Sequence, residues 1–115
     1  KSGLTDAVLK SNVTMEEAEN KLMCFLEPFF NPGEGILCGN SIHVDRAFML
    51  KCMPRLEKMF HYRILDVSAL KILARAWYPQ MSPHEKKETH RALDDILESI
   101  DELRYYRKEM FTNVS

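Results

Sequence analysis

Two short apolar segments, set among helical ones, constrain this chain more than any other feature of its sequence. Residues 36–39 form an apolar run bounded by turn residues, and residues 62–67 form a second apolar segment. We predict that both are strands and that the first is buried. Helical patterns surround them in the order helix–strand–helix–strand–helix–helix, which predicts an α/β fold, mostly helical, with two short parallel strands. Two strands are too few for a usual α/β sheet, so we expect the fold to be incomplete.

Thr14 opens the first long helix. Its hydroxyl and the Glu17 carboxylate form a predicted capping box, in which each side chain satisfies a backbone N–H of the first turn. Pro28 ends or bends this helix, and a shorter helix is expected over residues 4–10. Apolar residues at helical spacing predict the inward face of the helix that Thr14 opens: Met15, Ala18, Leu22, Phe25 or Leu26, and Phe29.

The later helices are bounded by caps and prolines. Asn40 and Ser41 can cap a helix over residues 44–60, which Pro54 divides into two pieces. Ser68 is the expected cap of the next helix, and the last helix is expected over residues 89–110, after a polar loop. The expected inward residues of the helix after Ser68 are Leu70, Leu73, Ala74 and Trp77. Those of the last helix are Ala92, Leu93, Ile96, Ile100 and Leu103.

Length and net charge limit the number of domains and the classes of function that are possible for this chain. Its 115 residues make one domain at most, and a net charge of −1 argues against a broad basic surface for long nucleic acids, though not against short ones. Its three cysteines form no C-x-x-C pair and are expected to be buried, reduced thiols of an intracellular protein. No apolar run is long enough to span a membrane. Because the first residue is Lys1 and not Met, we expect the chain to start inside a longer protein or to follow processing.

Asp45 is the first candidate for chemistry. It shares one helical face with Phe48, Met49 and Cys52, so an acid falls on an apolar stripe. A buried carboxylate needs a cation, a proton or a metal ion. The alternative is a first-turn acid that the helix dipole favours, and the pattern alone favours that alternative.

A second candidate group lies at the start of the last helix. Asp94 lies opposite the apolar face of this helix, whereas Asp95 lies nearer its edge and is the one that could reach a site beside the core. His90 can bond a helix cap or act as a base with a pKa near neutrality. Solvent exposure is the alternative for both residues. The histidines and cysteines show no zinc spacing, and no glycine-rich nucleotide-binding motif is present.

Several blocks of the sequence, in order along nearly the whole chain, resemble oligoribonucleases, most closely animal members of the mitochondrial type. They are residues 39–48 (GNSIHVDRAF), 61–68 (HYRILDVS) and 90–96 (HRALDDI), with shorter matches at 1–5, 53–54 and 77–79. The resemblance implies a ribonuclease H-like exonuclease fold with four acidic metal ligands and an active-site histidine. It also implies a homodimer, short single-stranded RNA and dinucleotides as substrates, and a mitochondrial or cytoplasmic location.

Individual roles follow from the same resemblance. Asp45 and Asp95 are implied to help hold two divalent ions, Mg²⁺ or Mn²⁺, and His90 to be the general base for the attacking water. Ser41, Arg63 and Ser68 resemble residues that cap the 5′ phosphate of a dinucleotide. Tyr62 resembles an aromatic residue that stacks on a base across the dimer. The alternative role for the two serines is a helix cap. The alternative for Tyr62 and Arg63 is the start of a strand with a surface ion pair.

The chain departs from the family at its first motif, an Asp-x-Glu, which occurs nowhere in it. We therefore interpret residues 1–115 as the C-terminal part of a single exonuclease domain whose N-terminal strands are absent. We expect little or no activity from this chain alone, and an exposed edge on the strand at residues 36–39. The alternatives are a non-catalytic nucleotide-binding or dimerisation module, a helical interaction domain, and an exonuclease of the DNA-proofreading type.

Overall fold

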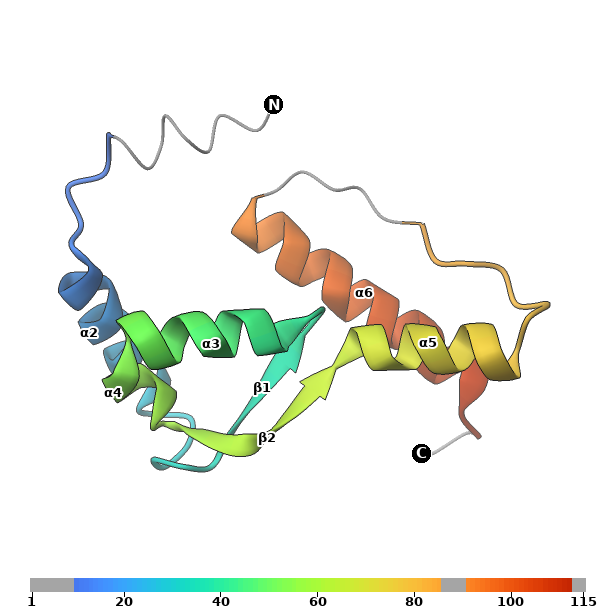
Figure 1. The fold of residues 1–115 in the computed structure, drawn as a ribbon, viewed down its shortest axis with the longest axis horizontal. Helices are drawn as coiled ribbons and strands as arrows, with labels where there is room; N and C mark the ends of the chain where they lie inside the picture. Colours follow the sequence, from blue (N-terminus) through green and yellow to red (C-terminus); the bar gives the residue numbers. More distant parts are fainter. Residues whose placement is uncertain (1–9, 86–90, 113–115) are drawn as a thin grey trace.

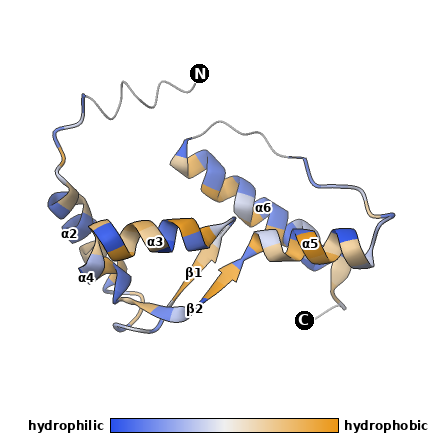
Figure 2. Ribbon diagram, viewed as in Figure 1, coloured by the Kyte–Doolittle hydropathy of each residue, from blue (hydrophilic) through white to orange (hydrophobic). Residues whose placement is uncertain are grey.

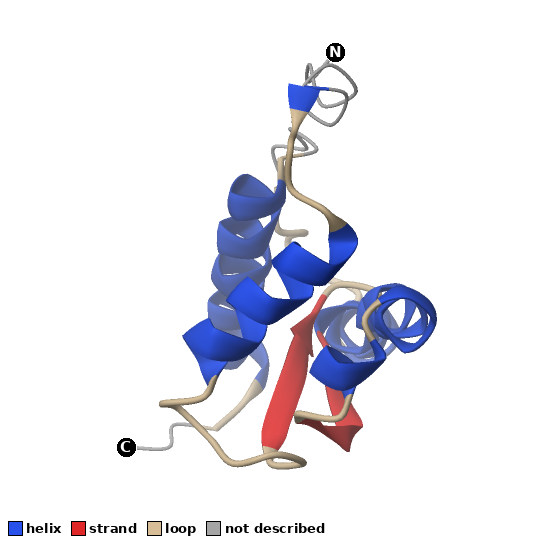
Figure 3. Cartoon of the chain, turned by 90° about the vertical axis from the view of Figure 1, so that its left-hand side faces the viewer, coloured by secondary structure: helices blue, strands red, loops and turns tan. Residues whose placement is uncertain are grey.

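The computed structural model describes residues 10–85 and 91–112. Figure 1 shows helices and strands in the predicted alternation. They are α2 (Met15–Leu26), β1 (Gly35–Gly39), α3 (Ile42–Cys52), α4 (Pro54–Glu57), β2 (Phe60–Asp66), α5 (Val67–Trp77) and α6 (Ala92–Met110). Helices make up most of the described chain, and the two strands form a small piece among them (Figure 3). The helix expected over residues 4–10 lies outside the described residues except for its last position.

The strands are parallel, as predicted. Leu37 pairs with Ile64 and Gly39 with Asp66, and the register shifts between Gly35 and Leu37. Helices α3 and α4 make the connection between them, with the predicted break at Pro54, which is the first residue of α4. Within the described residues each strand has a single strand neighbour, so each keeps one free edge. Over the same residues, no helix combines the length and the apolar character that a membrane span requires.

The prediction that the first strand is buried is wrong for this structure. Ile36 is 52% exposed, and Cys38 is also exposed, while Gly35, the first residue of β1, is buried. Alternate residues of a strand point to opposite faces, and in β1 Leu37 and Gly39 are half-buried whereas Ile36 and Cys38 are exposed. The apolar colouring of β1 and the end of β2 in Figure 2 therefore includes side chains that meet solvent. The prediction that the cysteines are buried is corrected as well, because Cys24 and Cys38 are exposed and Cys52 is half-buried.

Helix α2 begins as predicted but buries only part of its predicted inward face. The Thr14 hydroxyl accepts from the Glu17 N–H (3.1 Å) and donates to the Glu17 carboxylate (3.2 Å), so one half of the expected capping box is present. The expected inward residues Met15, Leu22, Phe25 and Phe29 are exposed. Ala18 and Leu26 face inward as predicted, and together with Met23 they pack against a core of Met49, Met53, Leu56 and Met59.

The buried side chain in this face of α2 is an acid. Glu19 is 5% exposed, and its Oε2 accepts from the backbone N–H groups of Arg55 (2.9 Å) and Leu56 (3.0 Å). Its Oε1 accepts from the Arg55 guanidinium at 2.9 Å. The Leu56 N–H lowers the pKa of this carboxyl most strongly, and Arg55 adds to the effect against the opposing influence of burial. Glu19 thus holds α2 against the start of α4, which sets the face that α2 buries.

A second core joins α5 to α6. Val67, Ala74 and Tyr106 are buried there, and Leu70 and Leu103 pack against them as predicted. Trp77 is 65% exposed, and Leu93, Ile96 and Ile100 are exposed, so these inward assignments are wrong. The buried residues of α6 are Glu102 and Tyr106, which lie in its second half. The first half of α6 therefore presents its apolar face to solvent.

Candidate functional site

The ends of the two parallel strands lie side by side, and a helix follows each of them (Figure 1). Gly39, the last residue of β1, pairs with Asp66, the last residue of β2. The carboxyl ends of parallel strands are where ligands bind in open α/β sheets, and two helix N-termini there favour an anion. Ser41 and Ser68 both lie at this place, immediately before α3 and inside the first turn of α5.

Asp66 connects these two serines. Its Oδ1 accepts from the Ser41 N–H and from the Ser68 N–H, both at 2.9 Å. Asp66, and not Ser68, is therefore the N-cap of α5, which corrects the cap predicted from the sequence. Asp is itself a favoured N-cap residue. The sequence pattern did not identify Asp66 as the cap, because the strand predicted over residues 62–67 included it. His43 Nδ1 lies 3.8 Å from the other carboxylate oxygen.

The environment of Asp66 favours its charged form. Partial burial by itself raises the pKa of this carboxyl, but the hydrogen bonds from Ser41 and Ser68 outweigh it and leave the pKa below its ordinary value. His43 contributes in the same direction. Asp66 therefore carries a negative charge at neutral pH and occupies two of the N–H groups at the helix starts.

Ser41 has a backbone conformation that is uncommon for its residue type. Its φ of 52° lies in the left-handed region, and its side chain makes no capping hydrogen bond, which corrects its predicted capping role. Such conformations cost about 1–3 kcal/mol and cluster at functional sites. The Ser41 hydroxyl is exposed and makes no hydrogen bond within the described residues, so it is free to meet a ligand.

A buried polar network joins these strand ends to α6. The Asn40 amide nitrogen donates to Ser99 Oγ at 2.8 Å and to Glu102 Oε1 at 3.0 Å, and its oxygen accepts from the Ser68 hydroxyl at 3.0 Å. Tyr106 donates to Glu102 Oε2 at 2.9 Å. Glu102 is 1% exposed, and burial, followed by the bond to Glu102, raises the pKa of Tyr106 to about 12. The sequence pattern missed this network, because nothing in it marks Glu102 as buried.

Tyr62 and Arg63 form a separate exposed cluster on β2. The Arg63 guanidinium carbon lies 5.4 Å from the centre of the Tyr62 ring, and the His61 ring stacks on the same tyrosine at 4.4 Å. Tyr62 is 64% exposed, and the Arg46 guanidinium donates to its carbonyl. The structure therefore brings Ser41 together with Ser68, and Tyr62 together with Arg63, as two separate groups. Within the described residues no hydrogen bond links the second pair to the first.

The predicted metal ligands lie in the first turns of two helices. Asp45 in α3 and Asp95 in α6 are both exposed. Met49 of the same stripe is buried, but Asp45 itself meets solvent, which agrees with the favoured alternative of a first-turn acid and not with a buried carboxylate. His90 lies outside the described residues. Within residues 10–85 and 91–112, no three His, Cys, Asp or Glu side chains come together to hold a metal ion.

Comparison of the whole sequence with known families places the chain in a class of nucleases. A family model described as "Exonuclease" matches residues 2–103, and the chain belongs to this exonuclease family. Among curated proteins it is 53% identical over 111 residues to the oligoribonuclease of Hydrogenovibrio crunogenus, covering 96% of this chain and 60% of that protein. It is 50% identical over 114 residues to the oligoribonuclease of Dichelobacter nodosus, covering 99% and 63%.

An animal relative is also similar. The probable oligoribonuclease of Caenorhabditis elegans is 46% identical over 110 residues, covering 96% of this chain and 57% of that protein. Because bacterial relatives match at least as well, the animal mitochondrial type stays a prediction. The chain spans about 60% of the length of the curated relatives that it matches.

Proposed function

We propose that this chain is part of a 3′→5′ exoribonuclease that degrades short oligoribonucleotides to mononucleotides. Two of its relatives that bear the name oligoribonuclease match 96% and 99% of it. One observation carries the proposal. At the carboxyl ends of the parallel strands, Asp66 accepts hydrogen bonds from the N–H groups of both Ser41 and Ser68. These are residues at which the family resemblance predicts the 5′ phosphate of a dinucleotide.

The phosphate-binding role rests on the side chains at this place. Asp66 occupies the Ser41 and Ser68 N–H groups, which leaves the serine hydroxyls and a nearby cation to bind an anion. The Ser41 hydroxyl is free, whereas the Ser68 hydroxyl donates to Asn40 and has to exchange that bond for a phosphate oxygen. Arg63 supplies the positive charge that a phosphate needs, in a planar fork that suits two oxygens.

Tyr62 is proposed to stack on a base. Its ring is 64% exposed, and His61 and Arg63 on either side of it in sequence restrict its position. Stacking on an aromatic ring is tolerant of sequence, as a nuclease for any short RNA requires. By the resemblance, this ring reaches the active site of the other protomer in a homodimer, so each site of the dimer is completed by its partner.

Asp45 and Asp95 are proposed as metal ligands and His90 as the general base. Carboxylate oxygens are the donors that Mg²⁺ and Mn²⁺ prefer, and both acids are open to solvent. The described residues alone do not fit a two-metal centre, because they contain no group of three ligands. We propose that the remaining acids lie in the part of the relatives that this chain does not span, and that this chain alone has little or no activity.

A second function fits the same observation. With no three-ligand group among the described residues and no Asp-x-Glu in the sequence, a non-catalytic nucleotide-binding or dimerisation module of the exonuclease fold is the alternative. A longer form of the protein that includes the region present in the relatives distinguishes these two functions. Such a form cleaves RNA if the chain belongs to an exoribonuclease, and does not if the chain is a non-catalytic module.

We also propose a mitochondrial or cytoplasmic location. The support is the family resemblance of the sequence blocks. Fractionation of cells that express the full gene, followed by detection with an antibody to this chain, tests it.

The phosphate-binding role can be tested on this chain directly. Binding of a 5′-phosphorylated RNA dinucleotide, followed by the fluorescence of a labelled 3′ end, is expected to weaken about tenfold in Arg63→Met, since a charge-assisted pair is lost. Arg104→Met removes the same charge from an exposed position on α6 and serves as the matched control. Equal affinities of the two variants contradict the assignment of Arg63.

A further inference from the structure

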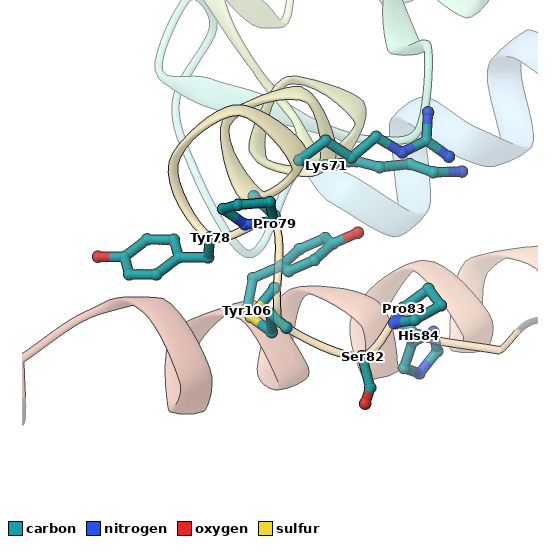
Figure 4. Close-up of a pocket in the computed structure, with 10 residues that line it drawn as sticks. Lys71, Tyr78, Pro79, Ser82, Pro83, His84 and Tyr106 are labelled. Atoms are coloured by element: carbon teal, nitrogen blue, oxygen red, sulfur yellow. The ribbon is translucent and has the colours of Figure 1, made fainter.

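A cavity lies away from the strand ends, between α5, the second half of α6 and the segment that follows α5. Its volume is about 250 Å³, and its lining includes Lys71, Arg75, His84 and Tyr106. In Figure 4 the Tyr106 side chain lies between Lys71 of α5 and His84 of the 78–84 segment. A volume of this size holds about eight waters at ~30 Å³ each, or one small ligand. It is too small for an oligonucleotide.

Two cations border this cavity from one helix. Lys71 and Arg75 are one turn apart on α5, so they share a face. Neither forms an ion pair with another described residue. Glu102 of α6 is not among the lining residues, and its carboxylate accepts hydrogen bonds from Asn40 and Tyr106. The wall therefore carries two positive charges with no carboxylate facing them from the lining.

The opposite wall has a polar atom without a partner. Nδ1 of His84 is buried and has no hydrogen-bond partner among the described residues. Buried polar atoms in native structures are almost always bonded, so an orphan of this kind points to a ligand or an ordered water. The His84 ring is held in place: it packs on Tyr105 with ring centres 5.5 Å apart, and the Tyr105 hydroxyl donates to the Ser82 carbonyl.

The donors around the cavity differ in direction. Lys71 and Arg75 line the cavity from α5 and His84 lines it from the segment after α5, while the Tyr106 hydroxyl is already donated to Glu102. Donors from several directions suit the tetrahedral oxygens of a phosphate better than the planar oxygens of a carboxylate. A phosphate fills only part of the volume, which leaves room for a small organic group.

We propose that this cavity binds a small phosphomonoester, with its phosphate between Lys71, Arg75 and His84. The proposal does not rest on exonuclease activity, since none of these residues belongs to the strand-end site. It adds to the molecule a second anion site, which α5 borders through Lys71 and Arg75.

The test is a titration of the ¹⁵N-labelled chain with glycerol phosphate and, separately, with inorganic phosphate, at ionic strength held constant with sodium chloride. Saturable shifts in the amide signals of residues 71–84 are expected. Saturation by both ligands shows that the phosphate group is recognised, and saturation by glycerol phosphate alone shows that the organic part is needed as well. Shifts that stay linear with either ligand, or that spread over the whole chain, overturn the proposal.

Variants locate the site. The double change Lys71→Met and Arg75→Met is expected to weaken binding at least about tenfold. The control double change Lys51→Met and Arg104→Met alters net charge equally at exposed positions outside the cavity, and is expected to leave binding within about twofold. Equal loss in both double variants overturns the proposal. His84→Ala provides a further variant with no change on α5, and unchanged affinity in it contradicts the assigned role of Nδ1.

Discussion

Among single residues, Asp66 makes the connections that define the strand ends. Asp66→Asn keeps the shape of the side chain but removes its charge. We expect the free energy of unfolding at pH 7 to fall by about 0.5–1 kcal/mol, since water screens part of this interaction. Because the folded-state pKa lies below the unfolded value of about 3.9, this stabilisation is present above that pH and is lost as the pH falls through the folded-state pKa.

Denaturant unfolding of Asp66→Asn and of the unchanged chain, between pH 7 and pH 3, measures this effect. The difference between the two proteins should shrink on the acid side. Asp101→Asn changes an acid that is 60% exposed and serves as the control. A difference that stays constant across this pH range is inconsistent with the charge of Asp66 acting through Ser41 and Ser68.

The bond between Tyr106 and Glu102 permits a second prediction. Tyr106→Phe keeps the buried ring but leaves Glu102 Oε2 without this donor, and we expect a loss of about 1–3 kcal/mol in the free energy of unfolding. Tyr62→Phe removes a hydroxyl from a ring that is 64% exposed and should change it by less than about 0.5 kcal/mol. Similar effects from the two changes, by thermal or urea unfolding, contradict the buried network.

Some site residues could be predicted from the sequence and others could not, for a physical reason. Ser41 and Ser68 were found through blocks of resemblance, and the structure places both at the strand ends. Glu102 was missed because a charged residue in a helical pattern is assigned to solvent. Its burial depends on Asn40, which is 62 positions away along the chain, and a periodic pattern does not carry such pairings.

At the scale of elements, the sequence predicted the boundaries better than the faces. The Thr14 start of α2, the break at Pro54 and the parallel strands are confirmed. The inward face of α2 is confirmed only at Ala18 and Leu26, because Glu19 bonds the start of α4 and turns its own side of the helix inward. An apolar stripe predicts which face prefers burial, whereas the available partner decides which face is buried in this chain.

Two truncations test that orientation of α2. Leu56→Ala, at a position 3% exposed beneath the Glu19 side of the helix, is expected to cost about 2–5 kcal/mol. Phe25→Ala, at a position 67% exposed on the apolar stripe, should cost less than about 0.5 kcal/mol in this chain. If thermal unfolding shows Phe25→Ala to be the more damaging change, the stripe is buried after all.

For the whole molecule, the exposed apolar residues share one explanation. They lie on both strands and on α2, α3, α5 and α6, and include Ile36 of β1, Phe25 of α2, and Leu93 and Ile96 of α6. A free strand edge beside apolar surface favours pairing with another chain. We expect concentration-dependent association by sedimentation, reduced by Ile36→Lys without loss of helical signal. A chain that stays strictly monomeric at high concentration counts against both this association and the proposed homodimer.

The central claim, that this chain is part of an exoribonuclease, is tested most directly by Mg²⁺- or Mn²⁺-dependent cleavage of a 5′-labelled RNA dinucleotide. The chain is compared with a form extended by the region that its relatives possess, and with Asp45→Asn and Asp95→Asn in that form. The account predicts cleavage by the extended form only, reduced at least about a hundredfold by either change and unaffected by Asp101→Asn. No cleavage by the extended form, or cleavage that survives both changes, contradicts it.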